Sequence, residues 1–163
     1  MKRACDRTGL DYLYSLQLSG IKLGLDNMRE LLARLGDPQA SLRCVHLAGT
    51  NGKGSTAAAL AAILHTAGIS AGLYTSPHLH HFSERIRIDT RQISALETDA
   101  LIAEIRPHAD ALGVTFFEFA TAMALLIFKH RGVSWAILET GLGGRLDATN
   151  VVDPELTAIT SIS

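Results

Sequence analysis

The chain has 163 residues, of which 47% are hydrophobic and 19% are charged, so the composition predicts one folded domain with a substantial core and argues against disorder. Fifteen basic and sixteen acidic residues leave a formal charge of −1. Because no basic stripe with interleaved aromatic residues is present, the sequence argues against nucleic acid as a partner and favours small molecules.

Two features of the sequence bear on its location. The cysteines, Cys5 and Cys44, form neither a disulfide framework nor a metal-spaced cluster, which is typical of the reducing cytosol. No apolar signal core follows the charged N-terminus, and the longest apolar run, residues 119–128, is far shorter than the ~20 residues that span a bilayer. We therefore expect a cytoplasmic protein that has no membrane segment, and we expect it to be a monomer.

Two short helices are predicted near the N-terminus. Residues 11–18 and 27–35 each carry apolar side chains close to the helical period. Two glycines interrupt residues 19–25 between them, which predicts a loop. Gly36 and Pro38 are expected to end the second helix, because glycine adopts the left-handed cap conformation and proline cannot continue a helix.

A glycine-rich loop follows an apolar strand-like run, 42–47, and precedes an alanine-rich helical run, 55–67. Its glycines allow backbone N–H groups to approach an anion, the helix offers its positive end, and Lys53 adds a full charge. The Walker spacing requires a glycine where Leu47 stands, so the loop is a shortened form. This order of elements predicts nucleotide phosphate binding rather than a turn with a solvated lysine. The loop consists of Gly49, Thr50, Asn51, Gly52, Lys53, Gly54 and Ser55.

The next strand, residues 71–74, should run parallel to the first, since a crossover through a helix needs a parallel partner. Ligands collect beyond the carboxyl ends of parallel strands, so Ser76 and His78 fall on the same rim as the phosphate loop. Ser76 offers a hard oxygen, which magnesium prefers. The histidines of this segment match no metal-binding spacing, so we interpret them as polar rim residues rather than zinc ligands.

Charged and apolar residues alternate over 83–88, which predicts a half-exposed strand or an extended loop with its charges in solvent. Ser94 and Glu97 have the spacing of a capping box, and an amphipathic helix is predicted from there to about Leu112. Pro107 is expected to bend or shorten that helix.

A strongly apolar helix is predicted to run through Phe128. Glu118 stands in its first turn, where a carboxylate complements the positive end of the helix dipole, and the residue alone favours this structural role over a site role. The segment that leads into the helix is Thr115, Phe116, Phe117 and Glu118.

The third strand, residues 133–138, has the apolar character of a sheet covered on both faces, and Glu139 stands at its end. A carboxylate there resembles a Walker B residue and predicts a magnesium ligand; the alternative is a surface glutamate. Glycines among residues 141–144, followed by the charge of Asp147, predict a substrate-facing loop. Residues 156–162 predict a fourth strand. The elements together predict an α/β fold: a P-loop-like mononucleotide-binding domain with a mostly parallel sheet and helices on both faces, truncated at its end.

Three motifs carry a resemblance to a known family. They are HLAGTNGKGS at 46–55, YTSPHL at 74–79 and LETGLGGRLDATN at 138–150. In this order they resemble the folylpolyglutamate synthase and dihydrofolate synthase family, relatives of the Mur ligases, from about residue 21 to the last residue. The shortened phosphate loop is the form that this superfamily uses.

The resemblance implies an ATP-dependent ligase that joins L-glutamate to dihydropteroate or to folates through an acyl phosphate, and therefore a role in folate biosynthesis. It implies ATP and Mg²⁺ as cofactors, with residues 49–55 on the triphosphate and Lys53 as the catalytic residue that neutralises charge during transfer. Ser76 and Glu139 would be the magnesium ligands, and Phe116 or Phe117 would stack on the flat ring. The residues implied to contact the pterin-bearing substrate are Thr115, Phe116, Phe117, Glu118, Leu146, Asp147 and Ala148.

Family members are much longer than this chain, and they carry a further metal-binding histidine, a carbamylated lysine and a C-terminal domain that binds glutamate. We therefore expect residues 1–163 to be an incomplete N-terminal ATP-binding domain, inactive as a ligase alone. Two other functions stay open: a P-loop kinase or NTPase of small molecules, and a non-catalytic nucleotide-binding module. The sequence does not decide between dihydrofolate synthase, folylpolyglutamate synthase and a bifunctional enzyme.

Overall fold

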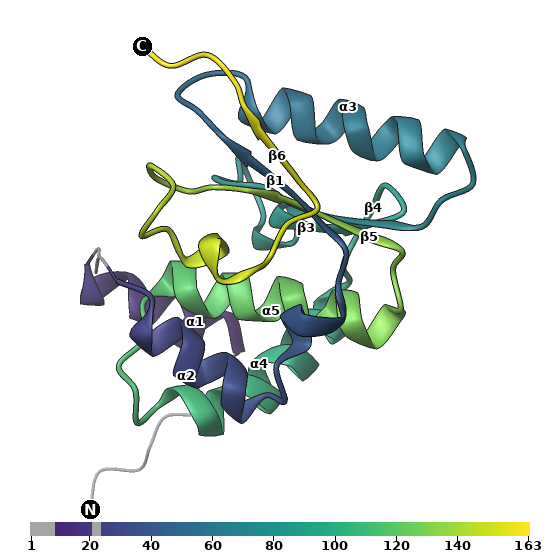
Figure 1. Ribbon diagram of the computed structural model, residues 1–163. Coiled ribbons are helices and arrows are strands. Elements are labelled where there is room, and N and C mark those ends of the chain that lie inside the picture. Colours follow the sequence, from purple (N-terminus) through teal and green to yellow (C-terminus); the bar gives the residue numbers. More distant parts are fainter. Residues whose placement is uncertain (1–8, 21–23) are drawn as a thin grey trace, which may run out of the picture.

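The computed structural model describes residues 9–20 and 24–163, and these form a six-stranded sheet with helices on both faces (Figure 1). The strand order is β4-β3-β2-β5-β1-β6. Strands β2, β5, β1 and β6 run parallel to one another. Strand β3 is antiparallel to β2 and forms an antiparallel hairpin with β4 at one edge of the sheet. The strands are β1 (Cys44–Ala48), β2 (Ala71–Tyr74), β3 (Ile86–Ile88), β4 (Arg91–Gln92), β5 (Trp135–Glu139) and β6 (Leu156–Ile159).

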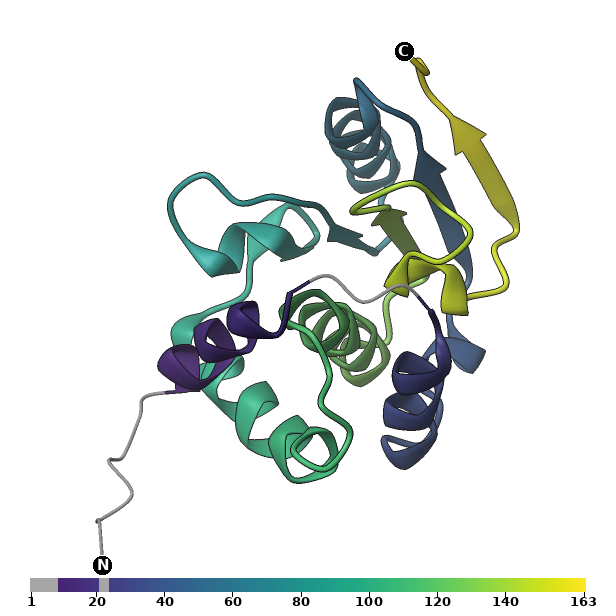
Figure 2. The same ribbon diagram turned by 90° about the vertical axis from the view of Figure 1, so that its left-hand side faces the viewer.

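The helices form one layer above the sheet and two below it. Helix α3 covers one face, α5 covers the other, and α1, α2 and α4 surround α5 (Figures 1 and 2). The α-helices are α1 (Gly9–Ser15), α2 (Asp26–Arg34), α3 (Lys53–Thr66), α4 (Ala95–Ala109) and α5 (Phe116–Arg131). Short 3-10 helices occur at η1 (Leu16–Ser19), η2 (Pro38–Ser41), η3 (Phe82–Arg85) and η4 (Ala148–Val151).

The core lies on both faces of the sheet because alternate strand residues point to opposite sides. Cys44, Tyr74 and Leu138 contribute to the larger cluster around α5, while Val45 and Leu73 pack under α3. Helix α5 is buried along nearly its whole length, from its first turn to residue 128. A helix that is apolar all round is stable only when other elements enclose it, and this explains the two layers of helices below the sheet.

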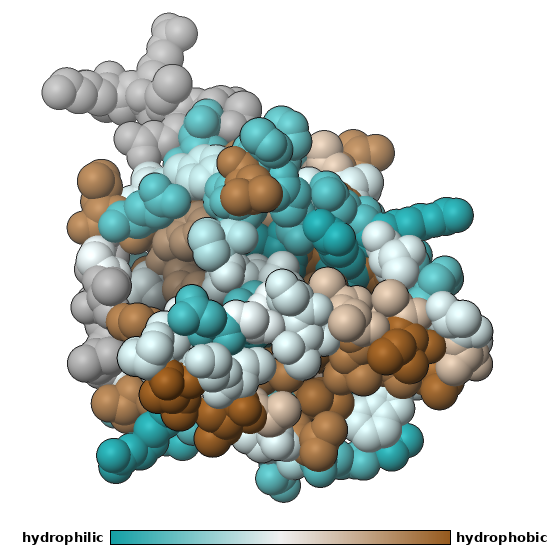
Figure 3. Space-filling model, turned by 90° about the horizontal axis from the view of Figure 1, so that it is seen from above, coloured by the Kyte–Doolittle hydropathy of each residue, from teal (hydrophilic) through white to brown (hydrophobic). Residues whose placement is uncertain are grey.

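Helix α3 and strand β6 lie at one border of the molecule, and Figure 3 looks onto this face, on which apolar side chains gather in patches. Ile63 of α3 and Ile159 of β6 are 64% and 65% exposed. No strand among the described residues pairs with the outer edge of β6. Within the described part of the chain, no helix combines the length and the apolar character needed to cross a membrane.

The mostly parallel α/β fold confirms the prediction from sequence, with differences in detail. Helix α3 begins at Lys53, two residues before the expected start, and α4 accommodates Pro107 but ends at Ala109 rather than near residue 112. The prediction of a strand or extended loop over 83–88 was wrong for its first half, because residues up to Arg85 form η3. The loop expected at 19–25 lies partly outside the described residues.

Candidate active site

The phosphate loop connects β1 to α3 at the carboxyl edge of the sheet. Gly49 and Gly52 have φ values of 136° and 84°, which side-chain-bearing residues rarely adopt. A Cβ atom at Gly49 would also collide with the Thr160 side chain, so only glycine allows the loop to pass this close to the segment after β6. The Lys53 Nζ atom donates a hydrogen bond of 2.9 Å to the Gly49 carbonyl oxygen, which places the ammonium group over the loop.

The backbone donors of the loop fall into two groups. The Thr50 and Asn51 N–H groups donate to the Ser161 carbonyl oxygen, at 2.7 and 3.3 Å. The N–H groups at the start of α3, by contrast, have no acceptor within the helix, as in the first turn of any helix. Residues 49–52 thus form the loop and residues 53–55 the first turn of α3, and the helix N-terminus is the part best suited to an anion.

Glu139 lies at the end of β5 and is buried, with 5% of its surface exposed. Its Oε2 atom accepts a hydrogen bond of 3.0 Å from the Ser76 N–H. A Cβ atom at Gly54 would stand 3.3 Å from the same oxygen, so the glycine lets the start of α3 approach the carboxylate. Burial raises the pKa of Glu139, while the Ser76 and Gly54 N–H groups and the Lys53 charge oppose that rise.

The two predicted magnesium ligands, Ser76 and Glu139, are thus neighbours beside the phosphate loop. A hydroxyl and a carboxylate are the hard oxygen donors that Mg²⁺ prefers, and Mg²⁺ commonly uses few protein ligands together with substrate phosphates. A bound cation would also favour the charged form of the buried carboxylate. Within residues 9–20 and 24–163, no group of three or more His, Cys, Asp or Glu residues could hold a metal by itself.

A cavity of about 430 Å³ opens next to Ser76, and its size is that of a small-molecule site. Its walls come from η1, the segment after β2, the end of η3, the start of α5 and the loop after β5. The seven residues predicted to contact the pterin-bearing substrate all line it: Thr115, Phe116, Phe117, Glu118, Leu146, Asp147 and Ala148. The structure therefore brings these residues together around one space beside the phosphate loop.

Aromatic side chains form one wall of the cavity. Phe116 stacks on Tyr14 at 5.9 Å between ring centroids, and Phe117 lies 5.9 Å from Tyr74. A Cβ atom at Gly141 would stand 2.6 Å from the Phe117 ring, so the loop after β5 can contact this ring only because residue 141 is glycine. The wall offers apolar faces on which a flat ring could pack.

Glu118 combines the structural role expected from its position with a place in the cavity wall. Its Oε2 atom accepts a 2.7 Å hydrogen bond from the Thr115 N–H, and its own N–H donates to the Thr115 Oγ1 atom at 3.2 Å. This reciprocal pair is a capping box at the start of α5. Both side chains are buried and held in place by it, so they form a fixed part of the wall.

Asp147 organises the loop after β5 instead of projecting a free charge. Its Oδ2 atom accepts the N–H groups of Gly141 and Leu142, both at 2.9 Å. Its Oδ1 atom accepts the N–H and the hydroxyl of Thr149, at 3.0 and 2.5 Å. Because Thr149 donates its hydroxyl proton to Asp147, the same hydroxyl can only accept from His46, so His46 donates from Nε2 in this 2.7 Å contact. His46 and Thr149 stood in the sequence motifs without an assigned role.

Arg85 lies in the cavity wall and was missed by the sequence analysis, which placed the charges of its segment in solvent. That interpretation was wrong for Arg85, which is only 7% exposed. Its Nε atom donates a hydrogen bond of 2.7 Å to Nδ1 of His78. The turn of η3 directs residue 85 inward, and an alternating pattern of charged and apolar residues gives no signal of such a turn.

Comparisons with known proteins identify the family. No family model matches the chain. It is 48% identical over 150 residues to the dihydrofolate synthase/folylpolyglutamate synthase of Bacillus subtilis (strain 168), covering 88% of this chain and 35% of that relative. The chain thus spans about a third of the length of this curated relative.

Solved structures agree. The structure of E. coli FolC in complex with DHPP and ADP superposes with a TM-score of 0.91 at 38% identity, covering 97% of this chain and 39% of that chain. A bifunctional folylpolyglutamate synthase/dihydrofolate synthase with Mn, AMPPNP and L-glutamate bound gives a TM-score of 0.90 at 40% identity over 97% of this chain and 39% of that chain. In sequence and in fold, the chain belongs to the folylpolyglutamate synthase and dihydrofolate synthase family, and it spans 35% to 39% of the length of the three relatives named here.

Proposed function

We propose that the chain is the ATP-binding part of a ligase that joins L-glutamate to dihydropteroate or a folate. One observation carries this proposal: the phosphate loop, the pair Ser76 and Glu139, and the aromatic-walled cavity meet at the same edge of the sheet. A substrate held in the cavity therefore ends beside the place where a triphosphate would bind. Relatives solved with DHPP and ADP, and with AMPPNP and L-glutamate, support the assignment.

The chemistry proceeds in two steps. A carboxylate oxygen of the pterin-bearing acid attacks the γ-phosphorus of ATP, the bond from that phosphorus to the bridging oxygen breaks, and ADP leaves. The amine of glutamate then attacks the acyl carbon, phosphate leaves, and the amine gives up a proton. The product is an amide bond, and one ATP becomes ADP and phosphate for each glutamate added.

The phosphate side of the site neutralises charge. Lys53 is held over the loop by its hydrogen bond to the Gly49 carbonyl oxygen. In the proposed reaction its ammonium group neutralises the negative charge of the phosphoryl group during transfer. The N–H groups at the start of α3 would bind phosphate oxygens, apart from that of Gly54, which donates to Glu139. Ser76 and Glu139 would hold Mg²⁺, which supplies charge neutralisation at the phosphates when bound.

The remaining parts of the proposal concern the whole protein. We infer that residues 1–163 form an N-terminal ATP-binding domain, and that residues elsewhere in a longer enzyme bind glutamate, because the curated relative is almost three times as long as the matched region. We expect these residues alone to lack ligase activity. We also infer a cytoplasmic monomer that contacts neither nucleic acid nor membranes, as the near-neutral charge of −1 supports.

The first test measures binding of ATP with magnesium by titration calorimetry. Lys53→Ala should weaken the affinity at least about tenfold, equivalent to ~1.4 kcal/mol, because it removes the charge at the phosphate loop. Lys129→Ala is the matched control, since Lys129 bonds the Gly36 carbonyl at the far end of α5. Equal affinities of the Lys53 variant and the unchanged chain would contradict the assignment of the loop.

A second measurement separates the ligase from the other functions. The enzyme that carries this chain is incubated with ATP, dihydropteroate and glutamate, and ADP and glutamyl amide are quantified. Formation of amide in step with ADP supports the ligase. ADP without amide would instead indicate a kinase or NTPase, and binding of ATP without turnover would indicate a nucleotide-binding module.

A further inference from the structure

Arg85 places a positive charge in the wall of the cavity. It shares that wall with Ser76, which belongs to the phosphate rim, and with Phe116, which belongs to the aromatic wall. Its Cζ atom lies 5.1 Å from the centroid of the Phe116 ring. The guanidinium group therefore stands at the junction between the space for a flat ring and the space for phosphate.

The partners of Arg85 are neutral. Nε donates to the imidazole of His78, the Phe116 ring lies against the guanidinium, and the Tyr74 hydroxyl also interacts with it. None of the ion pairs among the described residues includes Arg85. The charge of Glu139 acts on Arg85 without an ion-pair contact between the two side chains. Since arginine keeps its charge in proteins and a buried charge is costly without a directly bonded opposite charge, an anion in the cavity would be stabilised beside Arg85.

The chemistry of ligation identifies that anion. The acid must present its carboxylate next to the γ-phosphate, because a carboxylate oxygen attacks the phosphorus. If the ring lies against Phe116 and Phe117, the other end of the acid points to the rim at Ser76, where Arg85 stands. The planar fork of arginine matches a carboxylate better than any other side chain does.

We propose that Arg85 binds the carboxylate of the pterin-bearing acid and orients it for phosphoryl transfer. This inference rests on the proposed function, since it assumes that such an acid occupies the cavity. His78 acts as a positioning residue: it accepts from Nε and so fixes the plane of the guanidinium. The 2.7 Å contact assigns Nδ1 of His78 as the acceptor, because the Arg85 Nε atom can only donate.

The test compares two ligands that differ only in charge. Pteroate carries the carboxylate, and its carboxamide carries a neutral group in the same place; binding of each to the chain is followed by titration calorimetry. We expect the unchanged chain to bind pteroate at least tenfold more tightly than the carboxamide. Arg85→Gln should remove this preference while the affinity for the carboxamide changes less than twofold, and Arg85→Lys should keep part of the preference.

Arg91→Gln is the control, because Arg91 is exposed on β4 in the neighbouring hairpin and should leave both affinities unchanged. Circular dichroism establishes that each variant is folded, and if the glutamine variant is not, the lysine variant decides. A preference for pteroate that survives in the folded Arg85 variants overturns the inference, and so does an equal loss of affinity for both ligands. Failure of the unchanged chain to bind either ligand overturns the proposed function and this inference together.

Discussion

The hydroxyl of Thr149 joins two parts of the site. It donates to Asp147, which holds the loop after β5, and it receives the N–H of His46 from β1, the strand that leads into the phosphate loop. Thr149 is fully buried, so no water replaces these contacts. Burial is also the largest cause of the lowered pKa of His46, in agreement with a neutral ring that donates from Nε2.

Thr149→Val removes the hydroxyl and keeps the shape of the side chain. We expect a loss of about 1–3 kcal/mol in the free energy of unfolding, because the buried N–H of His46 is left without an acceptor. Urea unfolding followed by the fluorescence of Trp135, the single tryptophan, measures the change. Thr149→Ser restores the hydroxyl and should recover most of the loss; a valine variant as stable as the unchanged chain would show that the network contributes nothing.

The residue scale also shows where prediction from sequence stops. The motifs were enough to bring Glu118 and Asp147 to the cavity, but they did not show that both carboxylates are engaged in hydrogen bonds to their own segments. For Glu118 the structural and the site interpretations were treated as alternatives, yet the capping box and the cavity wall use the same side chain. Arg85 was missed because its burial depends on η3, a turn set by tertiary packing.

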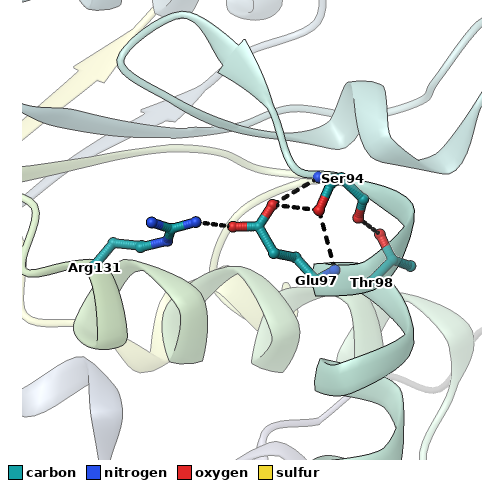
Figure 4. A network of polar contacts seen from close by, with 4 residues as sticks. All are labelled: Ser94, Glu97, Thr98 and Arg131. Atoms are coloured by element: carbon teal, nitrogen blue, oxygen red, sulfur yellow. Dashed lines mark hydrogen bonds and ion pairs between the residues drawn. The ribbon is translucent and has the colours of Figure 1, made fainter.

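Two helices meet through a single carboxylate at the side of the molecule remote from the phosphate loop. Glu97 closes the predicted capping box of α4 by accepting the N–H and the hydroxyl of Ser94, both at 2.8 Å, and it also pairs with Arg131 in the last turn of α5 (Figure 4). The hydrogen bond from the Ser94 N–H, followed by the contact with Arg131, lowers the pKa of Glu97 from 4.5 to about 2. The carboxylate thus ties the start of α4 to the end of α5.

This network predicts acid sensitivity. Because the pKa of Glu97 is lower in the folded chain than in the unfolded one, its stabilisation is complete above pH 4.5 and is lost as the pH falls towards about 2. Glu97→Gln should reduce the free energy of unfolding by about 0.5–1 kcal/mol at pH 7. Below pH 4.5, the free energy of unfolding should fall less steeply with pH in this variant than in the unchanged chain. Urea unfolding at pH 7 and pH 3 measures both effects.

Glu104→Gln is the matched control on the same helix. Its contact with His130 is 3.7 Å long between exposed side chains, so the substitution should change stability little. An acid decline as steep in the Glu97 variant as in the unchanged chain would mean that other groups govern acid stability.

Across the whole molecule, the arrangement of the sheet predicts a gradient of local stability. Strand β5 has partners on both sides and α5 is enclosed, whereas β4 is a two-residue edge strand with exposed side chains. Amide hydrogen exchange should therefore be slowest in β5 and α5 and at least about a hundredfold faster in β4. Exchange in α5 as fast as in β4 would contradict this description of the core.

The sequence did not predict the order of the strands in the sheet. Helical crossovers predicted parallel strands, and the carboxyl-edge rule placed Ser76 and Glu139 on one rim, which the structure shows. Neither rule states which strands are neighbours, and β5 enters between β1 and β2 although it comes last of the three. The hairpin partner β4 has two residues, too few for any periodic pattern.

The insertion of β5 has a consequence for synthesis of the protein. Strand β1 carries the phosphate loop, yet both strands that pair with it, β5 and β6, begin at residue 135 or later. A nascent chain that has left the ribosome only as far as α5 contains every residue of the loop but no strand to hold β1 in place. The residues of the proposed ATP site are therefore synthesised early but brought together late, and we expect the chain to bind ATP only after translation has passed β5.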